Sequence, residues 1–145
     1  MLVQAILKSK ATEGVMTVAP DVTVSDASKI LAEKRIGTVV VSEDGGKSAA
    51  GILSERDIVR ELAASGSGCL SKPVSAYMTS DLVTATRQDS VQDVLSRMTE
   101  GRFRHMPIVE DGKLIGIVTL GDVVKAQLSE LAMEKEALET MIMGH

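Results

Sequence analysis

Strand-like and helix-like patterns of hydrophobic residues alternate along this chain. Two short apolar runs, residues 15–18 and 82–85, have the length and composition of strands. Each run is followed by a stretch whose apolar residues recur every three or four positions, as on one face of a helix. The helical stripe consists of Ala27, Ile30 and Leu31 in the first stretch and of Val94, Leu95 and Met98 in the second.

Polar capping residues predict where helices begin. A Ser or Thr followed three residues later by an acidic residue is typical of a helix N-terminus, because both side chains accept hydrogen bonds from free backbone N–H groups. This pattern occurs at Thr23/Asp26, Ser54/Asp57, Ser90/Asp93 and Thr119/Asp122. A helix is expected after each.

Two Asp-Gly pairs, Asp44-Gly45 and Asp111-Gly112, lie between apolar runs and predict β-hairpins. The expected strand pairs are 38–41 with 49–53 and 106–109 with 114–118. Each hairpin leads directly into one of the capped helices, so the order of elements in each half of the chain is β-α-β-β-α.

The same order of elements occurs twice, and matching residues indicate a duplication. The matches are Met16-Thr17 with Met78-Thr79, Thr23–Asp26 with Ser90–Asp93, and Gly51–Asp57 with Gly116–Asp122. The offset in numbering is not the same for the three matches. We interpret the drift as five extra residues in the second copy, around 82–87, and two fewer in its hairpin, because loops tolerate changes of length.

A unit of about 60 residues is only marginally stable alone, because it buries too little of its surface. The predicted fold class is therefore α+β, with two β-α-β-β-α repeats packed sheet to sheet about a pseudo-twofold axis. Such packing creates two related clefts. The expected division is a first domain at 1–64, a linker at 65–72 that contains Ser-Gly-Ser-Gly, a second domain at 73–130 and a helical extension at 131–145.

A long helix is expected at the end of the chain, from about Asp122 to Met143. Its apolar stripe consists of Val124, Leu128, Leu131, Leu138 and Met141. The inner half completes the core of the second repeat. The outer half is interpreted as a contact with another subunit, which predicts a homodimer, and the alternative is a solvated tail.

Composition and charge exclude several classes of protein. The 145 residues carry a formal net charge of −4, with 16 Lys and Arg against 20 Asp and Glu, which disfavours a nucleic-acid partner. Aromatic residues are 1% of the chain, so a base-stacking platform is not expected and aliphatic side chains must hold any flat ligand.

The sequence carries no evident pattern for metal binding or for export, which narrows the classes of protein to which it can belong. A single cysteine, Cys69, excludes an internal disulfide and a multi-cysteine zinc site, and no metal is predicted. No run approaches the roughly 20 apolar residues of a membrane span, and the first residues do not resemble a signal peptide. The expectation is a cytoplasmic protein without membrane insertion.

Gly-x-x-[Ser/Thr]-x-x-Asp is the motif that carries candidate chemistry, and it occurs in both repeats at Gly51–Asp57 and Gly116–Asp122. One interpretation is that the hydroxyl and the carboxylate serve only as helix caps. The other is ligand binding, because each motif lies where a strand ends and a helix begins. Free N–H groups there suit a phosphate, and a carboxylate accepts hydrogen bonds from both hydroxyls of a ribose.

The duplicated motif, together with Ile36–Val41 and Arg102–Val109, resembles a tandem pair of cystathionine β-synthase (CBS) domains, or Bateman module. The resemblance covers nearly the whole chain. It implies that Asp57 and Asp122 bind ribose hydroxyls and that Ser54 and Thr119 contact ribose or phosphate.

The resemblance also implies further contacts with a nucleotide. The Arg104-His105 pair is similar to the basic pair that reaches ligand phosphates in the γ subunit of AMP-activated protein kinase, and Arg56 is a third candidate for phosphate, with a solvated surface charge as its alternative. The candidates for lining the base are Thr17, Thr38, Val39, Thr79, Met106 and Pro107. Because Gly37-Thr38 replaces Arg-His in the first repeat, the two sites are expected to differ.

The leading hypothesis is a regulatory module that binds an adenine nucleotide and signals to a separate effector protein. AMP is the first candidate ligand, with ATP, ADP or NAD as alternatives. A ligand-free dimerisation or scaffold module is the second hypothesis. An enzyme is not predicted, because the sequence holds no nucleophile elbow, no Walker loop and no Cys/His pair, and His105 and His145 have no evident acid or base partner.

Overall fold

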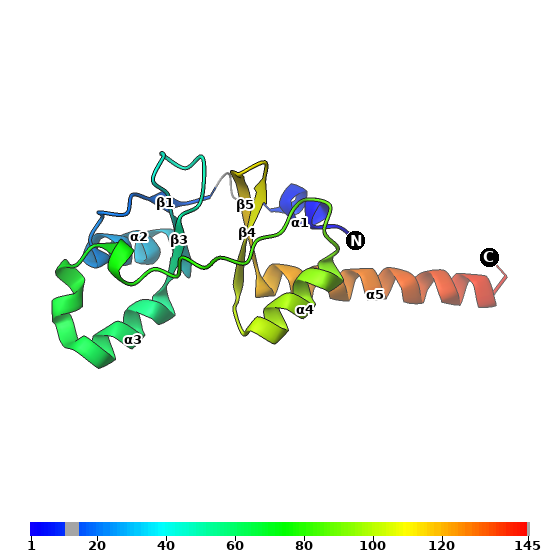
Figure 1. Cartoon of the computed structure of the whole chain (residues 1–145). Coiled ribbons are helices and arrows are strands. Elements are labelled where there is room, and N and C mark those ends of the chain that lie inside the picture. Colours follow the sequence, from blue (N-terminus) through cyan, green and yellow to red (C-terminus); the bar gives the residue numbers. More distant parts are fainter. Residues whose placement is uncertain (11–14, 145) are drawn as a thin grey trace.

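Two small β-sheets, each covered by helices, form the body of the protein, and one long helix projects from it (Figure 1). The computed structural model describes residues 1–10 and 15–144. The α+β class, the two packed units and the long last helix are as predicted. The backbone N–H of Leu114 in the second unit donates to the carbonyl of Lys47 in the first at 2.8 Å, so the two hairpins are in direct contact.

The first unit is built on a three-stranded sheet of order β1-β2-β3. Strand β1 (Thr17–Val18) runs parallel to β2 (Thr38–Val41), which pairs antiparallel with β3 (Gly51–Ser54). Helices α2 (Val24–Lys34) and α3 (Glu55–Ser65) follow β1 and β3. The hairpin and both helices confirm the sequence prediction. Valines of β2 and the apolar face of α2 form a separate hydrophobic core.

The second unit repeats this plan with a two-stranded sheet. Strands β4 (His105–Glu110) and β5 (Lys113–Thr119) form the expected antiparallel hairpin. Helix α4 (Val91–Gly101) precedes it and α5 (Leu120–Ile142) follows it. Apolar side chains of all four elements pack into a second core.

The strand predicted at 82–85 does not form, and only Ala85 bridges to Ile108 of β4. The reason is Pro107. In the first unit, the N–H of Val40 donates to the carbonyl of Met16 at 3.0 Å and extends the ladder toward the start of β1. Pro107 occupies the place of Val40 in β4 and has no N–H to donate. The chain before Ala85 therefore has no partner at this position and leaves the sheet.

The backbone pairing also corrects the predicted alignment of the repeats. The N–H of Ser42 donates to the carbonyl of Val18, and the N–H of Val109 donates in the same way to that of Ala85. Val18 and Ala85 are therefore equivalent, in the same register that relates Thr23 to Ser90. The match of Met16-Thr17 with Met78-Thr79 was wrong, because the true counterpart of this pair is Val83-Thr84. In this register the sequence counterpart of Thr79 is Thr12, which lies outside the described residues.

Helix α1 (Val3–Ser9) is an element that the hydrophobic pattern did not reveal. Although it precedes the first repeat, Val3 and Ile6 are buried in the core of the second unit. The amino group of Met1 makes an ion pair of 2.7 Å with Glu130 of α5. The predicted domain boundaries stay a prediction, but the packing shows that the start of the chain adds to the second core.

The segment predicted as a linker at 65–72 has regular structure. Helix α3 runs to Ser65, and the 3₁₀ helix η1 (Gly66–Ser71) follows at once. Cys69 is buried there against the first unit, because its small apolar side chain faces inward from the turn. A second 3₁₀ helix, η2 (Val74–Ala76), leads to the second repeat.

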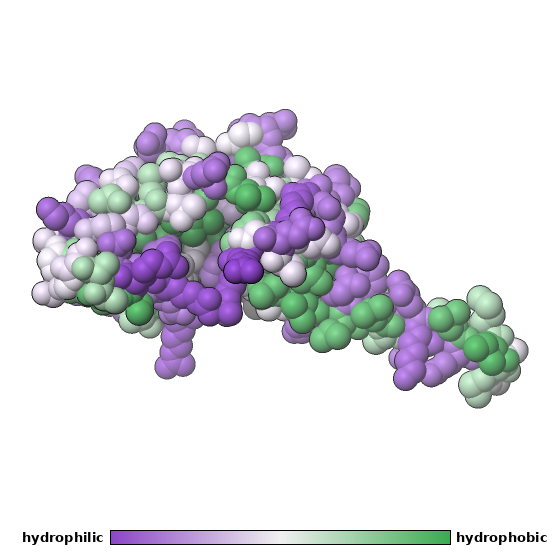
Figure 2. Space-filling model, turned by 60° about the horizontal axis from the view of Figure 1, so that its bottom comes forward, coloured by the Kyte–Doolittle hydropathy of each residue, from purple (hydrophilic) through white to green (hydrophobic). Residues whose placement is uncertain are grey.

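Helix α5 extends well beyond the body of the protein (Figure 1), and its predicted apolar stripe is exposed along its whole length. The expectation that the inner half of the stripe completes the second core was wrong, because Val123, and not Val124 or Leu128, is the α5 residue buried there. We call this surface the α5 stripe; its members are Val124, Leu128, Leu131, Leu138 and Met141. Figure 2 shows hydrophobic surface along α5 both near the body and at the end of the helix. Within the described ranges, none of the helices combines the length and the apolar character needed to cross a bilayer.

Candidate functional site

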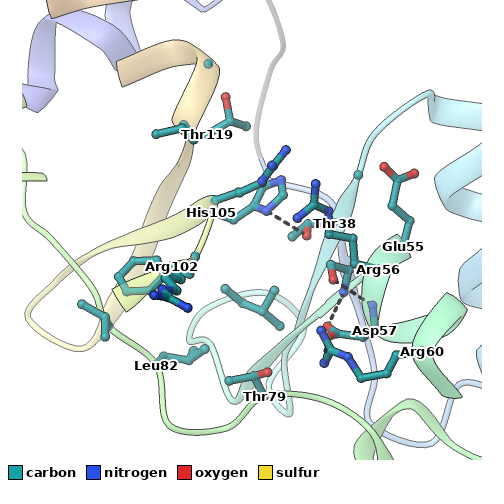
Figure 3. Close-up of a pocket in the computed structure, with 18 of the residues that line it drawn as sticks. Thr38, Glu55, Arg56, Asp57, Arg60, Thr79, Leu82, Arg102, His105 and Thr119 are labelled. Atoms are coloured by element: carbon teal, nitrogen blue, oxygen red, sulfur yellow. Dashed lines mark hydrogen bonds and ion pairs between the residues drawn. The ribbon is translucent and has the colours of Figure 1, made fainter. Parts of the chain in front are cut away.

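A cleft of about 710 Å³ lies between the two units, and we call it the first cleft (Figure 3). One wall is the start of α3, which carries Ser54, Arg56 and Asp57. The opposite wall comes from the second repeat and carries Arg104 and His105. The cleft thus brings together sequence-predicted residues of both repeats. The other predicted residues that line it are Thr38, Thr79 and Thr119.

Ser54 and Asp57 form a complete capping box at the start of α3. The Ser54 hydroxyl accepts from the N–H of Asp57 at 3.1 Å, and Oδ2 of Asp57 accepts from the N–H of Ser54 at 2.9 Å. The second carboxylate oxygen, Oδ1, lies 3.5 Å from a guanidinium nitrogen of Arg60, whose side chain is 73% exposed. The capping interpretation is therefore correct as geometry, and among the described residues it leaves Oδ1 of Asp57, which lines the cleft, with Arg60 as its one distant partner.

His105 lies where β4 enters the cleft, and its Nδ1 shares a hydrogen bond with the Thr38 hydroxyl at 3.3 Å (Figure 3). Burial lowers the pKa of His105 below 6.5, and the nearby cations Lys10 and Arg104 act in the same direction. The carboxylate of Glu55 opposes them. The ring is therefore neutral near pH 7.

Cations dominate the rest of the first cleft. Four arginines line it: Arg56, Arg60, Arg102 and Arg104. Guanidinium groups bind phosphate through paired N–H donors. Apolar contact is available from Ile52, Leu82, Val83 and Phe103. Arg102 and Arg104 lie opposite Asp57, whereas Arg56 and Arg60 share its wall with Glu55, and Asp81 also lines the cleft. The combination of a carboxylate, guanidinium groups and apolar side chains suits a ligand that carries a diol, a phosphate and a flat ring.

A second cleft, of about 580 Å³, lies on the other side of His105 and Thr38. These two residues, with Gly37 and Thr119, line both clefts. The cations of the second cleft are Lys10, Lys34 and Arg35.

Asp122, the expected ribose residue of the second repeat, is not among the residues that line either cleft, although its two hydrogen-bond partners line the second one. Its Oδ2 accepts from the N–H of Thr119 and from Nζ of Lys10, at 2.9 Å each. Burial alone would raise the pKa of Asp122, but the Thr119 N–H and Lys10 outweigh it and hold that pKa below 3.8.

Four of the residues expected to line the base are not brought to either cleft. Val39, Met106 and Pro107 are buried in the cores, because both faces of β2 and β4 are covered. Thr17 faces the hairpin turn, where its Oγ1 would lie 3.3 Å from a β-carbon at Gly46.

Three arginines of the clefts were not singled out from the sequence: Arg60, which follows Asp57 by one helical turn, and two that end helices. Arg102 lines the first cleft and Arg35 the second, each as the residue that ends a helix. Both adopt left-handed backbone, with φ of 56° and 53°. This conformation is uncommon for a residue with a side chain and tends to cluster at functional sites. The signal in the sequence was that an arginine follows both helices, at equivalent positions of the two repeats.

The glycines that open the two motifs serve close packing. A β-carbon at Gly51 would lie 2.5 Å from Sδ of Met78 and 3.0 Å from the carbonyl oxygen of Thr79. Thr79 can therefore bridge to Ile52 only because position 51 lacks a side chain. Gly116 permits a similar approach of the Leu7 side chain, because a β-carbon at Gly116 would lie 2.7 Å from Cδ2 of Leu7.

No group of three or more potential ligands that could hold a metal ion occurs among the residues whose placement is described. His145, the second histidine considered in the sequence, lies outside those residues.

Comparison with known proteins agrees with this architecture. The family model described as CBS domain matches residues 5–64 and 74–129. The "CBS domain-containing protein CBSX3, mitochondrial" of Arabidopsis thaliana is 36% identical over 141 residues, which cover 94% of this chain and 68% of that protein.

Solved structures support the same likeness. The CBS-domain containing protein ATU1752 from Agrobacterium tumefaciens has a TM-score of 0.82 at 39% identity, covering 88% of this chain and 99% of that one. The CBS domain pair of protein MJ0100, solved with 5′-methylthioadenosine and S-adenosyl-L-methionine, has a TM-score of 0.75 at 25% identity, over 87% of this chain and 98% of that one.

Proposed function

This chain belongs to the family of CBS domain proteins, and from that premise we propose that it is a non-enzymatic regulatory module that binds an adenine nucleotide in the first cleft. CBS domain pairs are regulatory modules in general. For this chain we propose in addition which ligand is bound, which cleft binds it and how binding is signalled to another protein.

The observation that carries the proposal is the composition of the first cleft. Asp57 presents one carboxylate oxygen to it, and Arg102 and Arg104 stand on the opposite wall. A ribose diol donates two hydrogen bonds to a carboxylate, and a phosphate accepts them from guanidinium groups. Both groups belong to one nucleotide. The Thr79 segment and the apolar residues between the walls are the proposed contacts of the base.

The ligand class follows from the same contacts. An adenosine moiety is supported by the structural neighbour solved with 5′-methylthioadenosine and S-adenosyl-L-methionine. The arginines favour a phosphate over an uncharged 5′ group, so AMP is the first candidate and ADP, ATP and NAD are the alternatives. Neither catalysis nor a metal ion enters the proposal.

The proposed output is a change in how the protein packs against a separate effector. Ligand contacts on both walls of the first cleft change the relative stability of arrangements of the two units. By linkage, an effector that prefers the liganded arrangement tightens nucleotide binding by the same factor. The α5 stripe is the proposed contact between two copies of the chain, since it is apolar and exposed.

A ligand-free scaffold is the second candidate function, and the complete capping boxes favour it. In that case Ser54, Asp57, Thr119 and Asp122 act only on helix stability. A capping side chain contributes about 1 kcal/mol.

Calorimetric titration with AMP, ADP, ATP, NAD and adenosine tests the proposal. The variant is Asp57→Asn, which keeps one oxygen for the cap but removes the charge. The matched control is Asp26→Asn, at the same position of helix α2 and outside both clefts. Before titration, mass spectrometry of the denatured protein must show that no nucleotide was carried through purification.

Saturable binding that Asp57→Asn weakens at least tenfold, and Asp26→Asn leaves unchanged, supports the module proposed here. Absence of heat with every ligand, from protein shown to be free of nucleotide, favours the scaffold. Turnover of ATP or NAD that depends on Asp57 would contradict the non-enzymatic assignment.

A further inference from the structure

The two ribose motifs of this chain are unequal, and the cause is a lysine near the start of the first repeat, outside both motifs. Nζ of Lys10 donates to Oδ2 of Asp122 and to the carbonyl oxygen of Ile117, at 2.9 Å each. It therefore joins helix α1 to the end of β5 and the start of α5. The side chains of Lys10 and Asp122 are 22% and 27% exposed, so the ion pair is largely shielded from water.

The equivalent carboxylate in the first motif has no such partner. Oδ1 of Asp57 contacts only the exposed Arg60, at 3.5 Å, among the described residues. In the register that relates Val18 to Ala85, the sequence position of Lys10 is occupied by Tyr77, which packs against the core of the first unit. The asymmetry thus arises at this equivalent position of the two repeats, which lies outside both Gly-x-x-[Ser/Thr]-x-x-Asp motifs.

This difference changes what each cleft presents to a ligand. Asp57 lines the first cleft, whereas Lys10, and not Asp122, lines the second. A diol needs free acceptor positions that face the cleft. Oδ2 of Asp122 already accepts two hydrogen bonds, and Oδ1 has no partner among the described residues, but it is Lys10 and not the carboxylate that lines the second cleft. Displacement of Lys10 would break a shielded ion pair and leave an ammonium group without its partner, which is unfavourable.

We propose that Lys10 blocks the ribose position of the second cleft, so that each chain binds nucleotide in the first cleft in preference to the second. This inference rests on the proposed function for the identity of the ligand. It concerns a residue outside the repeated motifs and assigns it control over the number of ligands bound.

Titration calorimetry with AMP on the full chain tests the role of Lys10. The variant is Lys10→Met, which keeps the length of the side chain and removes the ammonium group; Lys10→Gln is the substitute if the methionine variant does not fold. The matched control is Lys34→Met, because Lys34 lines the same cleft but does not contact Asp122. Each is also combined with Asp57→Asn and with Asp122→Asn.

The expected result is one AMP per wild-type chain, lost in Asp57→Asn and kept in Asp122→Asn. Lys10→Met gains a second AMP that Asp122→Asn removes, and Lys34→Met stays at one. If Lys10→Met also stays at one, or if wild type already binds two, the role of Lys10 is overturned while nucleotide binding stands. If Lys34→Met also binds a second AMP, loss of any positive charge from the second cleft is sufficient, and the specific role of Lys10 is overturned as well.

Failure of the proposed function gives a different pattern. If wild type binds no AMP but Lys10→Met binds one that depends on Asp122, then Lys10 has the role proposed and the first cleft does not bind nucleotide. If none of the variants binds AMP, both proposals fall.

Discussion

Nδ1 of His105 and the hydroxyl of Thr38 lie 3.3 Å apart and join β4 of one unit to β2 of the other. Both residues line both clefts, so this hydrogen bond forms part of the wall between them. The two residues also occupy equivalent positions of the two repeats, which places the contact close to the pseudo-twofold axis. A ligand phosphate that attracts the ring would therefore affect the interface between the units.

Protein stability is expected to fall as the pH drops below about 6.5, through His105. Because burial lowers the pKa of His105 in the folded state, the unfolded chain binds more protons between that lowered pKa and 6.5. The contribution of the neutral His105 ring to the free energy of unfolding is complete above pH 6.5 and is lost as the pH falls through the folded-state pKa of His105. Urea unfolding at a series of pH values measures this slope.

The control for this prediction is His105→Asn, which should flatten the slope near pH 6. Asp44 and Asp122 do not interfere, because the pKa of Asp44 is about 2 and that of Asp122 lies below 3.8. An identical slope in wild type and variant would show that another group titrates in this range.

Arg104 is expected to distinguish AMP from adenosine. Arg104→Met should weaken AMP binding roughly tenfold to a hundredfold, since a hydrogen bond to a charged group contributes about 1.5–3 kcal/mol. Adenosine binding should be unchanged, because adenosine has no phosphate. Calorimetry with both ligands measures the difference. Lys113→Met, at the far end of the same hairpin, controls for loss of charge. Equal losses for AMP and adenosine would contradict a phosphate contact.

Gly51→Ala is expected to destabilise the protein by about 1–3 kcal/mol, the usual cost of overpacking. The added β-carbon would lie 2.5 Å from Sδ of Met78 and 3.0 Å from the backbone of Thr79, and backbone does not yield easily. Gly68→Ala is the control, because a β-carbon there meets nothing within 4 Å. Thermal or urea unfolding of the two variants provides the comparison, and equal stability would contradict the close approach at Gly51.

The α5 stripe is expected to hold a homodimer. Leu131→Glu should convert the dimer into a monomer, because it places a charge in the apolar contact between two copies. Thr140→Glu, on the opposite face of α5, should not. Sedimentation equilibrium over a range of concentrations measures the mass. A wild-type protein that stays monomeric at tens of micromolar would show that the stripe does not pair with a second copy.

The secondary structure of this protein is readable from short stretches of its sequence. The Asp-Gly turns predicted both hairpins, and the four Ser or Thr caps predicted the helices, because turns and caps depend on residues three or four positions apart. The duplicated motif likewise identified Ser54 and Asp57 as neighbours. The prediction of a strand at 82–85 was wrong because of Pro107, a residue that lies far from this segment in the sequence.

The sequence by itself determined the two repeats, their capped helices and the two candidate carboxylates, since all of these arise from local hydrogen bonds and periodic burial. Tertiary structure decided which carboxylate faces a cleft. Lys10 and Asp122 lie near opposite ends of the chain, so the motif around Asp122 does not show that this carboxylate is paired with a lysine. Their ion pair forms because α1 packs on the second unit, and that packing depends on the summed burial of Val3, Ile6 and their neighbours.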